Sequence, residues 1–574
     1  MKDTDNTSPV SKMDLELEHL ESVTQGTTRL YDGAFIRLVP MPSNHPDDPL
    51  NMRSYRRTLA IISVLFYGAI AIAMQQIMAS FLPVFMLEYA GLDPKLLNNP
   101  GGLNGVLAGR LGPIQGGAGG PLPAASGSSN PLAALAAIPG AQPLSRVNFL
   151  ASFPVLMVGL SNYFLIPLAV TFGRRPVMIF CGAIAWTACV WAGRSTSLSS
   201  HIAARCIQAI GAGAVESLIP LIVQDMSFIH QRNRAIGMVW ASQGVITISL
   251  GIGANYIVSR ISWRWLYFIG AIITAVSWLM IIFLMPETRW ERSPSELRGE
   301  KDDLDPTKRR PDIDYETYGR PTPWSEFGFF RNGGVNAKAG LEAVVGIMSS
   351  LTLPAVIYCV IMNAVLLGIS LGASLTATTV LLAPPYNWPF SSLGLLVIAP
   401  FIASIFVAVI GGYLSDKTTN YLTKKSGGVR EPEAHLWNFI FPLLAGVVGS
   451  VLYGVGGTLV ETVHWMCLLS GICLLTFSFL TVNVQASVFC IESYPTLAGP
   501  VLVNVSSFRN IIGFAFTYGI PDWVAGIGYL KTYGIFAAII ALMMVPLPMF
   551  FLYGKSFRKW GGFANNSAAN GVKN

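Results

Sequence analysis

The stretch PETRWERSPSELRGEKDDLDPTKRRPD, residues 286–312, divides the chain into two strongly apolar halves. It begins a hydrophilic segment that continues to about Gly346. Six apolar stretches precede this segment, from about Arg57 to Met285, and six follow it, from about Leu353 to Tyr553. A membrane helix needs roughly 20 apolar residues to cross a ~30 Å hydrocarbon core. The pattern predicts an all-α membrane protein with twelve transmembrane helices in two pseudo-symmetric six-helix bundles.

The chain is expected to have five parts and one long insertion. The parts are a disordered cytosolic tail (1–55), an N-terminal bundle (56–285), a cytosolic linker (286–350), a C-terminal bundle (351–554) and a second cytosolic tail (555–574). The insertion, residues 91–146, is rich in Gly, Pro, Ala and Ser, so we expect a low-complexity, dispensable extracellular loop. The expected spans are Thr58–Val84, Phe149–Val170, Pro176–Ala192, Ser200–Val223, Ala235–Val258, Trp265–Met285, Leu353–Leu381, Leu393–Leu414, Trp437–Gly457, Met466–Ile491, Val501–Val524 and Tyr533–Tyr553.

Composition and charge agree with a multi-pass membrane protein. The chain is 52% hydrophobic and only 12% charged, whereas a soluble chain carries roughly 25% charged residues. The net charge of +7 is concentrated in loops, so it concerns membrane orientation and not nucleic acid. The polar, acidic start lacks the apolar core of a signal peptide, so the first span is expected to act as an uncleaved anchor. Lysine and arginine favour the side of the termini and the linker, which places these in the cytosol, with the plasma membrane as the expected location.

Two short motifs lie at equivalent places in the two halves. Gly173, Arg174 and Arg175 follow the second span, and Gly412 and Asp416 lie at the end of the eighth. We take these five as candidate cytosolic gating residues. The alternative for the two arginines is plain anchoring by positive charge.

The fourth span carries ionisable side chains on an otherwise apolar helix. Arg205, Gln208 and Glu216 fall within an arc of about 80° and extend over about 16 Å of the helix axis. A buried charge costs several kcal/mol unless it faces a cavity or a partner. We therefore interpret these residues as candidates for substrate binding and proton coupling. The alternative is a structural charge locked inside the bundle.

Further polar side chains on apolar spans complete the candidate cavity. They are Gln75 and Gln76 in span one, Gln243 in span five, Asn363 in span seven, and Asn483 and Gln485 in span ten. An acid followed by an arginine also recurs at matching cytosolic positions, as Asp225 with Arg234 and Glu492 with Arg509. These four would suit a charge network that holds the two halves together; the alternative is surface charges of no consequence.

These motifs resemble a known family. The Gly173-Arg174-Arg175 turn, the Gly412–Asp416 segment and the Arg205–Ala214 segment resemble signatures of the major facilitator superfamily. Shorter matches at 48–51, 286–288, 430–433 and 493–495 are similar to its fungal branch of twelve-span drug:proton antiporter-like carriers, which also includes polyamine and cation carriers. The resemblance covers about residues 50–555. The chain departs from the pattern at Val170, where an acid is expected, and in span five, where the antiporter proline is missing.

The resemblance implies a secondary active transporter that works by alternating access. We expect proton-coupled efflux of a small organic molecule, such as a secondary metabolite, drug or toxin, by a monomer in a lipid bilayer. The alternative is proton-coupled uptake of an organic cation such as a polyamine, and a non-transporting nutrient receptor is a third possibility. The sequence lacks phosphate-binding, metalloprotease and serine-nucleophile motifs, so we expect no enzyme activity, cofactor or metal.

The gating motifs also predict an asymmetric cytosolic latch. By the pseudo-symmetry of the halves, Asp416 should approach the start of span five near Arg234. Arg509 should lack the matching acid from span two, because Val170 occupies that place. The latch would then hold the cytosolic side closed at one seam only.

Overall fold

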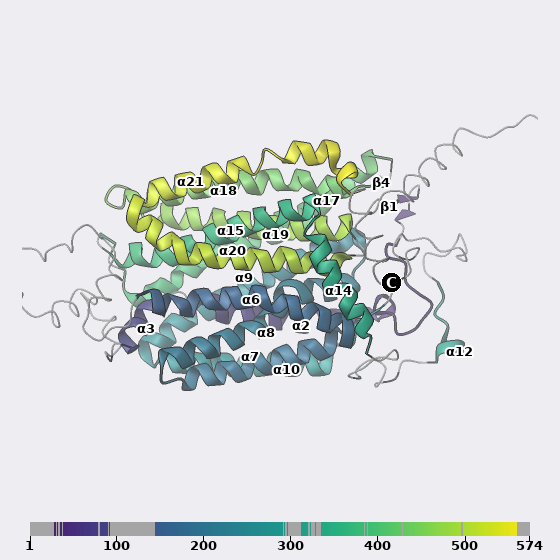
Figure 1. Cartoon of the computed structure of the whole chain (residues 1–574), viewed down its shortest axis with the longest axis horizontal. Helices are drawn as coiled ribbons and strands as arrows, with labels where there is room; N and C mark the ends of the chain where they lie inside the picture. Colours follow the sequence, from purple (N-terminus) through teal and green to yellow (C-terminus); the bar gives the residue numbers. More distant parts are fainter. Residues whose placement is uncertain are drawn as a thin grey trace, which may run out of the picture.

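The computed structural model shows two helical bundles packed side by side (Figure 1). It describes residues 28–29, 31–32, 35–36, 38–77, 81–89, 144–290, 311–319 and 335–558, the last with gaps at 384, 387, 428 and 495–496, and the single residues 91, 94, 292, 296, 322 and 328. Most of the loop expected at 91–146, most of the N-terminal tail and residues 559–574 lie outside these ranges.

The first bundle contains α2 (Ser54–Gln76), α3 (Leu82–Tyr89), α6 (Leu144–Phe172), α7 (Arg174–Arg194), α8 (Leu198–Asp225), α9 (Arg232–Arg260) and α10 (Trp263–Leu284). The second contains α15 (Pro354–Leu382), η5 (Phe390–Val397), α16 (Ile398–Phe406), η6 (Val407–Leu414), α17 (Ser415–Lys425), α18 (Trp437–Thr458), α19 (Met466–Ser493), α20 (Ala498–Ile527) and α21 (Tyr529–Leu542). A last helix, Leu547–Arg558, is bent by 43° from α21. Short elements outside the bundles are η1 (Pro49–Asn51), η4 (Ile229–Gln231), α12 (Tyr315–Tyr318), α14 (Ala337–Ser350), η7 (Pro432–Leu436) and the two-residue strands β1 (Thr28–Arg29), β2 (Tyr31–Asp32), β3 (Phe35–Ile36) and β4 (Val429–Arg430).

The predicted fold class is confirmed. Among the described residues, nine helices are long and apolar enough to cross a membrane, and the bent pair formed by α21 and Leu547–Arg558 makes ten. The remaining two expected spans are α9 and α20, which have 29 and 30 residues. Polar side chains such as Asn504, Arg509 and Asn510 make α20 less apolar than its neighbours. Span eight differs from a simple α-helix, because η6 has π-helical geometry.

Glycines allow the two bundles to approach closely along α9. Gly237, Gly244 and Gly251 recur at intervals of two helical turns, so they share one face of the helix. A side chain at Gly237 would meet Gly412 at 3.1 Å, one at Gly244 would collide with Ser404, and one at Gly251 would meet Val397 at 2.8 Å. The broken antiporter motif of span five therefore lies in the seam against η5, α16 and η6.

Residues 38–52 form a segment that we call the N-terminal strap. In the sequence they fall within the stretch expected to be a disordered tail, but here they pack against loops of the first bundle and the linker. Asp48 is buried and forms an ion pair with Arg292 at 2.8 Å. The Val39 carbonyl accepts a hydrogen bond from the N–H of Ile229, and the Met41 N–H donates to the Glu296 carbonyl.

Hydrogen bonds and charge keep Asp48 ionised. Burial alone raises the pKa of this carboxyl, but Arg292, together with the N–H groups of Ser43 and Leu50, brings the pKa below its ordinary value. Because the folded pKa lies below the unfolded one, the carboxylate stabilises the strap above the unfolded pKa. That contribution is lost as the pH falls through the folded pKa.

We predict that Asp48→Asn loosens the strap. The change leaves Arg292 buried without its carboxylate, which costs roughly 3 kcal/mol locally. Limited proteolysis should therefore cleave the strap faster at neutral pH, and the difference from wild type should shrink in acid. Asp47→Asn, at the neighbouring and less buried position, is the control. Equal cleavage of both variants and wild type would contradict the assignment.

Candidate functional site

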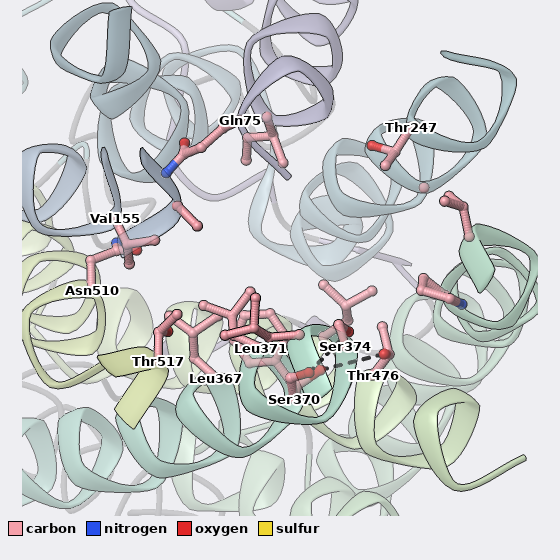
Figure 2. A pocket seen from close by; sticks show the side chains of 18 of the residues that line it. Gln75, Val155, Thr247, Leu367, Ser370, Leu371, Ser374, Thr476, Asn510 and Thr517 are labelled. Carbon is pink, nitrogen blue, oxygen red and sulfur yellow. Dashed lines mark hydrogen bonds between the residues drawn. The ribbon is translucent and has the colours of Figure 1, made fainter. Parts of the chain in front are cut away.

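A cavity of about 170 Å³ lies between the two bundles (Figure 2). The first bundle contributes its lining from α2, α6, α8 and α9, and the second from α15, η5, α16, α19 and α20. The lining residues are Ile72, Gln75, Ala151, Val155, Glu216, Gly244, Thr247, Leu367, Ser370, Leu371, Ser374, Leu375, Val397, Pro400, Thr476, Phe479, Leu480, Asn510 and Thr517. A site at the interface of two such halves is where a rocking carrier binds its substrate.

The cavity wall is mainly apolar, with a few polar groups. Figure 2 shows Ser370, Ser374 and Thr476 on one wall, with Gln75 and Thr247 opposite. The hydroxyls of Ser370 and Thr476 lie 3.4 Å apart, and Ser374 donates to the Ser370 carbonyl at 3.0 Å. Apolar walls with a few placed polar groups are typical of small-molecule sites.

Of the polar lining residues, the sequence singles out only Gln75 and Glu216, and not the serines, the threonines or Asn510. Ser370 and Ser374 are one turn apart on α15, and Asn510 and Thr517 are two turns apart on α20. That spacing was an available signal. Serine and threonine are common in packed membrane helices, however, where they bond to their own backbone, so the signal is weak.

Glu216 is the ionisable side chain that the described structure places at the cavity wall. Its carboxylate forms an ion pair with the guanidinium of Arg509, which comes from α20 in the other bundle. Arg509 also donates to the side-chain oxygen of Asn483 on α19. The side chain of Glu216 is 11% exposed and that of Arg509 only 2%, so the carboxylate faces the cavity with the guanidinium behind it.

The position of Arg509 corrects the expectation that it opens span eleven at the cytosolic end. The helix begins at Ala498, about 16 Å earlier along the axis. The interior can hold the arginine because Glu216 and Asn483 compensate its charge and its N–H groups. Asn483 is not among the residues that line the cavity; it contacts Arg509, which in turn contacts Glu216.

Arg205 and Gln208 have a different environment. Arg205 donates to the carbonyls of Met74 and Gln75, at 3.0 and 3.1 Å, and to the Gln208 side chain at 2.9 Å. Gln208 in turn lies 3.1 Å from the sulfur of Cys189. Arg205 therefore caps the last carbonyls of α2, and no contact that the structure gives for the described residues joins it to Glu216.

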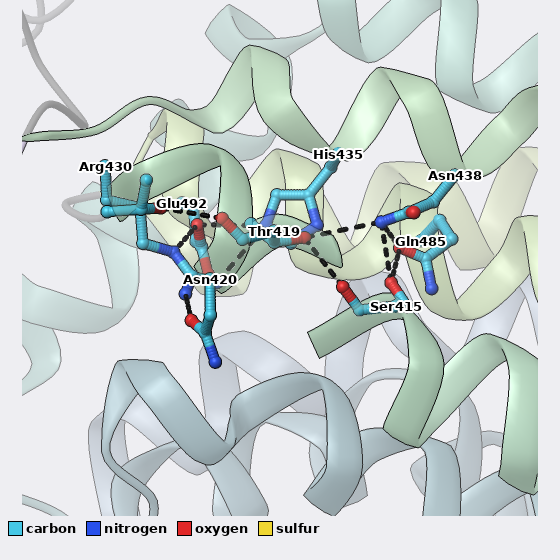
Figure 3. A network of polar contacts seen from close by, with 9 residues as sticks. Ser415, Thr419, Asn420, Arg430, His435, Asn438, Gln485 and Glu492 are labelled. Carbon is cyan, nitrogen blue, oxygen red and sulfur yellow. Dashed lines mark hydrogen bonds and ion pairs between the residues drawn. The ribbon is translucent and has the colours of Figure 1, made fainter. Parts of the chain in front are cut away.

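Two of the remaining cavity candidates, Asn363 and Gln485, are not among the residues that line the cavity. Asn363 is buried in α15 and donates to the Cys359 carbonyl one turn earlier at 3.0 Å. Gln485 accepts from Ser415 at 2.8 Å and donates to the Gly411 carbonyl at 2.7 Å, so it fastens η6 and α17 to α19 (Figure 3). The side chains of Gln76 and Gln243 lie outside the described part of the structure.

Glu492 belongs to a polar network within the second bundle (Figure 3). It binds Arg430 at 2.8 Å and His435 at 3.1 Å. The sequence predicts that Glu492 joins a charge network that holds the two halves together, but the partners that the structure gives it, Arg430 and His435, belong to its own half. We use "linker end" for the end at which α10 stops and α15 starts.

The corresponding corner of the first bundle is built around Gly173. Its φ of 112° is a conformation that favours glycine, and it lets the chain turn from α6 into α7. The Glu287 carboxylate then accepts from the backbone N–H groups of Arg174 and Arg175 at 2.9 and 3.1 Å, at the positive end of α7. Arg174 pairs with Asp225 at 3.2 Å.

Two further contacts involve residues of the gating motifs. Arg175 donates to the carbonyls of Met285 and Ile282, which fastens α7 to the end of α10. In the second bundle, Gly412 packs against Gly237 of α9, and the buried Asp416 follows it by one turn. The side chain of Arg234 lies outside the described residues.

The fold is that of a multi-pass α-helical membrane protein with a cavity between its two halves. A family model of the Major Facilitator Superfamily matches residues 122–517. An uncharacterized MFS-type transporter of Schizosaccharomyces pombe is 23% identical over 71% of this chain and 76% of its own length. The efflux pump FUB11 of Gibberella fujikuroi is 22% identical over 70% of this chain and 67% of its own length. The crystal structure of the human organic anion transporter MFSD10 superposes with a TM-score of 0.54, at 15% identity, over 85% of this chain and 99% of that one.

The chain belongs to the Major Facilitator Superfamily. Members of this family are transporters of small molecules and not enzymes, so the expectations of family, fold and absent enzyme activity are confirmed.

We predict that Glu216 and Arg509 each destabilise the fold when the other is removed. Glu216→Gln or Arg509→Met alone leaves one buried charge without its partner, at a cost of roughly 3–5 kcal/mol, whereas the double variant removes both charges. Thermal unfolding in detergent should show two destabilised single variants and a double variant near wild type. Glu88→Gln, which breaks the more exposed Glu88–Arg264 pair, is the control and should change stability by less than about 1 kcal/mol. Additive losses in the double variant would contradict the pairing.

Proposed function

We propose that this protein is a proton-coupled exporter of small organic molecules that works by alternating access. The observation that carries the proposal is the ion pair between Glu216 and Arg509, which joins the two halves at the wall of the cavity. A carboxylate at such a place can be neutralised by a proton or can bind a cationic group of the substrate. Either event weakens a contact between the halves.

The coupling follows from charge balance. While Glu216 is ionised, Arg509 attracts it across the seam and favours a state in which the halves are close at the cavity. Protonation leaves a neutral carboxyl that attracts the guanidinium far less, and Asn483 remains to receive an N–H of Arg509. A proton can therefore change the balance between two conformations, which is what coupling requires.

Export is supported by the relatives. One of them is named an efflux pump, and another, from Candida glabrata, a multidrug transporter. A mainly apolar cavity with single hydroxyl and amide groups suits small amphipathic molecules. We further propose that the protein is a monomer in the plasma membrane with both termini and the linker in the cytosol.

Uptake of an organic cation is the second candidate. Among the described residues that line the cavity, Glu216 alone carries a charge, and it is negative. A cation entering the cavity would pair with this carboxylate in competition with Arg509. Transport direction in cells separates the two candidates: loss of the gene should raise the intracellular level of an exported compound and lower that of an imported one.

We predict that Glu216→Gln abolishes proton-driven transport. The amide cannot be ionised, so a pH gradient no longer changes the contact with Arg509. In proteoliposomes loaded with a fluorescent organic cation, an imposed pH gradient should drive efflux by wild type but not by the variant. Since the single variant is also destabilised, the double variant Glu216→Gln, Arg509→Met should be folded and equally uncoupled. Gradient-driven efflux by that folded double variant would refute the role of Glu216.

We also predict that the latch at the linker end depends on Asp416. Gly412, one turn before Asp416, packs against Gly237 in the second turn of α9, and a helix N-terminus favours an anion. Asp416→Asn should therefore open the linker end more often, and Val170→Asp, which adds the acid missing from the first half, should close it. A cysteine at Ser374 in the cavity, in a background without native cysteines, should react faster or slower, respectively, with a thiol reagent added from that side. Unchanged rates in both variants would rule the latch out.

A further inference from the structure

The linker helix α14 lies across the seam between the two bundles at the linker end (Figure 1). Its first half touches the first bundle, where the N–H of Asn336 donates to the Thr171 carbonyl and Gly340 packs against the Thr171 side chain. Its second half touches the second bundle. There Gly346 packs against Pro500, and the Asn504 amide donates to the Ile347 carbonyl at 2.7 Å and to the Ser350 hydroxyl at 2.8 Å.

The inward face of α14 consists mainly of small residues, which allow this close contact. Its buried residues are Gly340, Ala343, Gly346, Ile347 and Ser350, which recur every three or four positions. Small residues at the crossing points let the backbone of α14 lie directly on α6 and α20. Asn336 caps the helix by accepting from the N–H of Ala339 at 3.1 Å.

The outward face of α14 is apolar as well. Leu341 is 64% exposed, Met348 52%, and Val344 and Val345 40% each. These four define what we call the outer ridge of α14. Lys338 and Glu342 are the charged side chains of this helix, and both are exposed. A helix that is apolar on opposite faces needs an apolar environment on both.

The surroundings of the outer ridge indicate what that environment is. The adjoining surface of α6 carries the exposed side chains of Phe164, Leu168 and Phe172, on a helix that spans the membrane. Thr171, which touches α14, lies within the same turn as Phe172. The outer ridge therefore continues the lipid-facing surface of α6 at the linker end.

We propose that α14 is an interfacial helix whose outer ridge lies among the lipids of the leaflet at the linker end. In this arrangement α14 contacts both bundles and the lipid. It therefore bridges the seam between α6 and α20 at the membrane surface. When the seam opens at this end, α14 must leave Thr171 or Asn504. The proposal concerns lipid contact and does not depend on the identity of the substrate or of the coupling ion.

The test is depth-resolved fluorescence quenching on the full-length protein in lipid nanodiscs. Single cysteines replace Val345 or Met348 in a background without native cysteines and carry an environment-sensitive fluorophore. Phe164→Cys on α6 is the lipid-facing control, and Tyr315→Cys, on the exposed helix α12, is the aqueous control. Lipids with a doxyl group near the headgroup, lipids with one near the chain end, and aqueous iodide are the quenchers.

The proposal predicts that both α14 labels lose fluorescence with headgroup-proximal doxyl lipid to an extent comparable with the Phe164 label. They should lose less with chain-end doxyl lipid and little with iodide, while the Tyr315 label should respond to iodide alone. Quenching of the α14 labels by iodide, as at Tyr315, would overturn the proposal. Resistance to all three quenchers would also overturn it, because it would show that protein, either the linker or a second copy, covers the ridge.

Discussion

The ion pair between Glu216 and Arg509 is the constraint that governs how the two halves of this structure meet. Among the described residues, Glu216 of the first half and Arg509 of the second half are buried with the opposite charge in the other half, and the two halves meet where these charges meet. Removing a charge from water into a membrane interior is expensive, so each half needs the other to keep its charge. Any event that neutralises Glu216 removes this need, which is why we propose the pair as the point of control for alternating access.

The packing around the pair permits movement without loss of the fold. Polar networks such as Arg430–Glu492–His435 and the Glu287 cap on α7 stay within one half, so each bundle is held together independently of the other. Among the described residues, the contacts between the halves include the glycines of α9, the close approach of Gly159 in α6 to Ser507, a hydrogen bond from Tyr163 to Asn504, and the Glu216–Arg509 ion pair. Contacts made by glycine backbones can separate and form again at a small cost in free energy.

The sequence predicts the fold because hydrophobic runs are a local signal. It singles out Glu216 as a candidate site residue because a lone carboxylate in such a run has few structural explanations. The partner of Glu216 could not be found in this way. The sequence pattern places Arg509 at the cytosolic end of its helix, but the start of α20 at Ala498 sets its depth and the crossing with α8 sets its contact. Helical phase likewise groups Arg205 with Glu216, but the partners of Arg205 are carbonyls exposed where α2 ends.

The most direct test of this account is the response of the two halves to pH. Spin labels replace Ile261 and Leu459, which are exposed residues at the ends of the two bundles opposite the linker end. The distance between the labels, measured by double electron–electron resonance, reports the separation of the halves. In a background without native cysteines, acidification should shift wild type toward a second distance population. Glu216→Gln should show that population at every pH. The same pH-dependent shift in Glu216→Gln as in wild type would contradict the account.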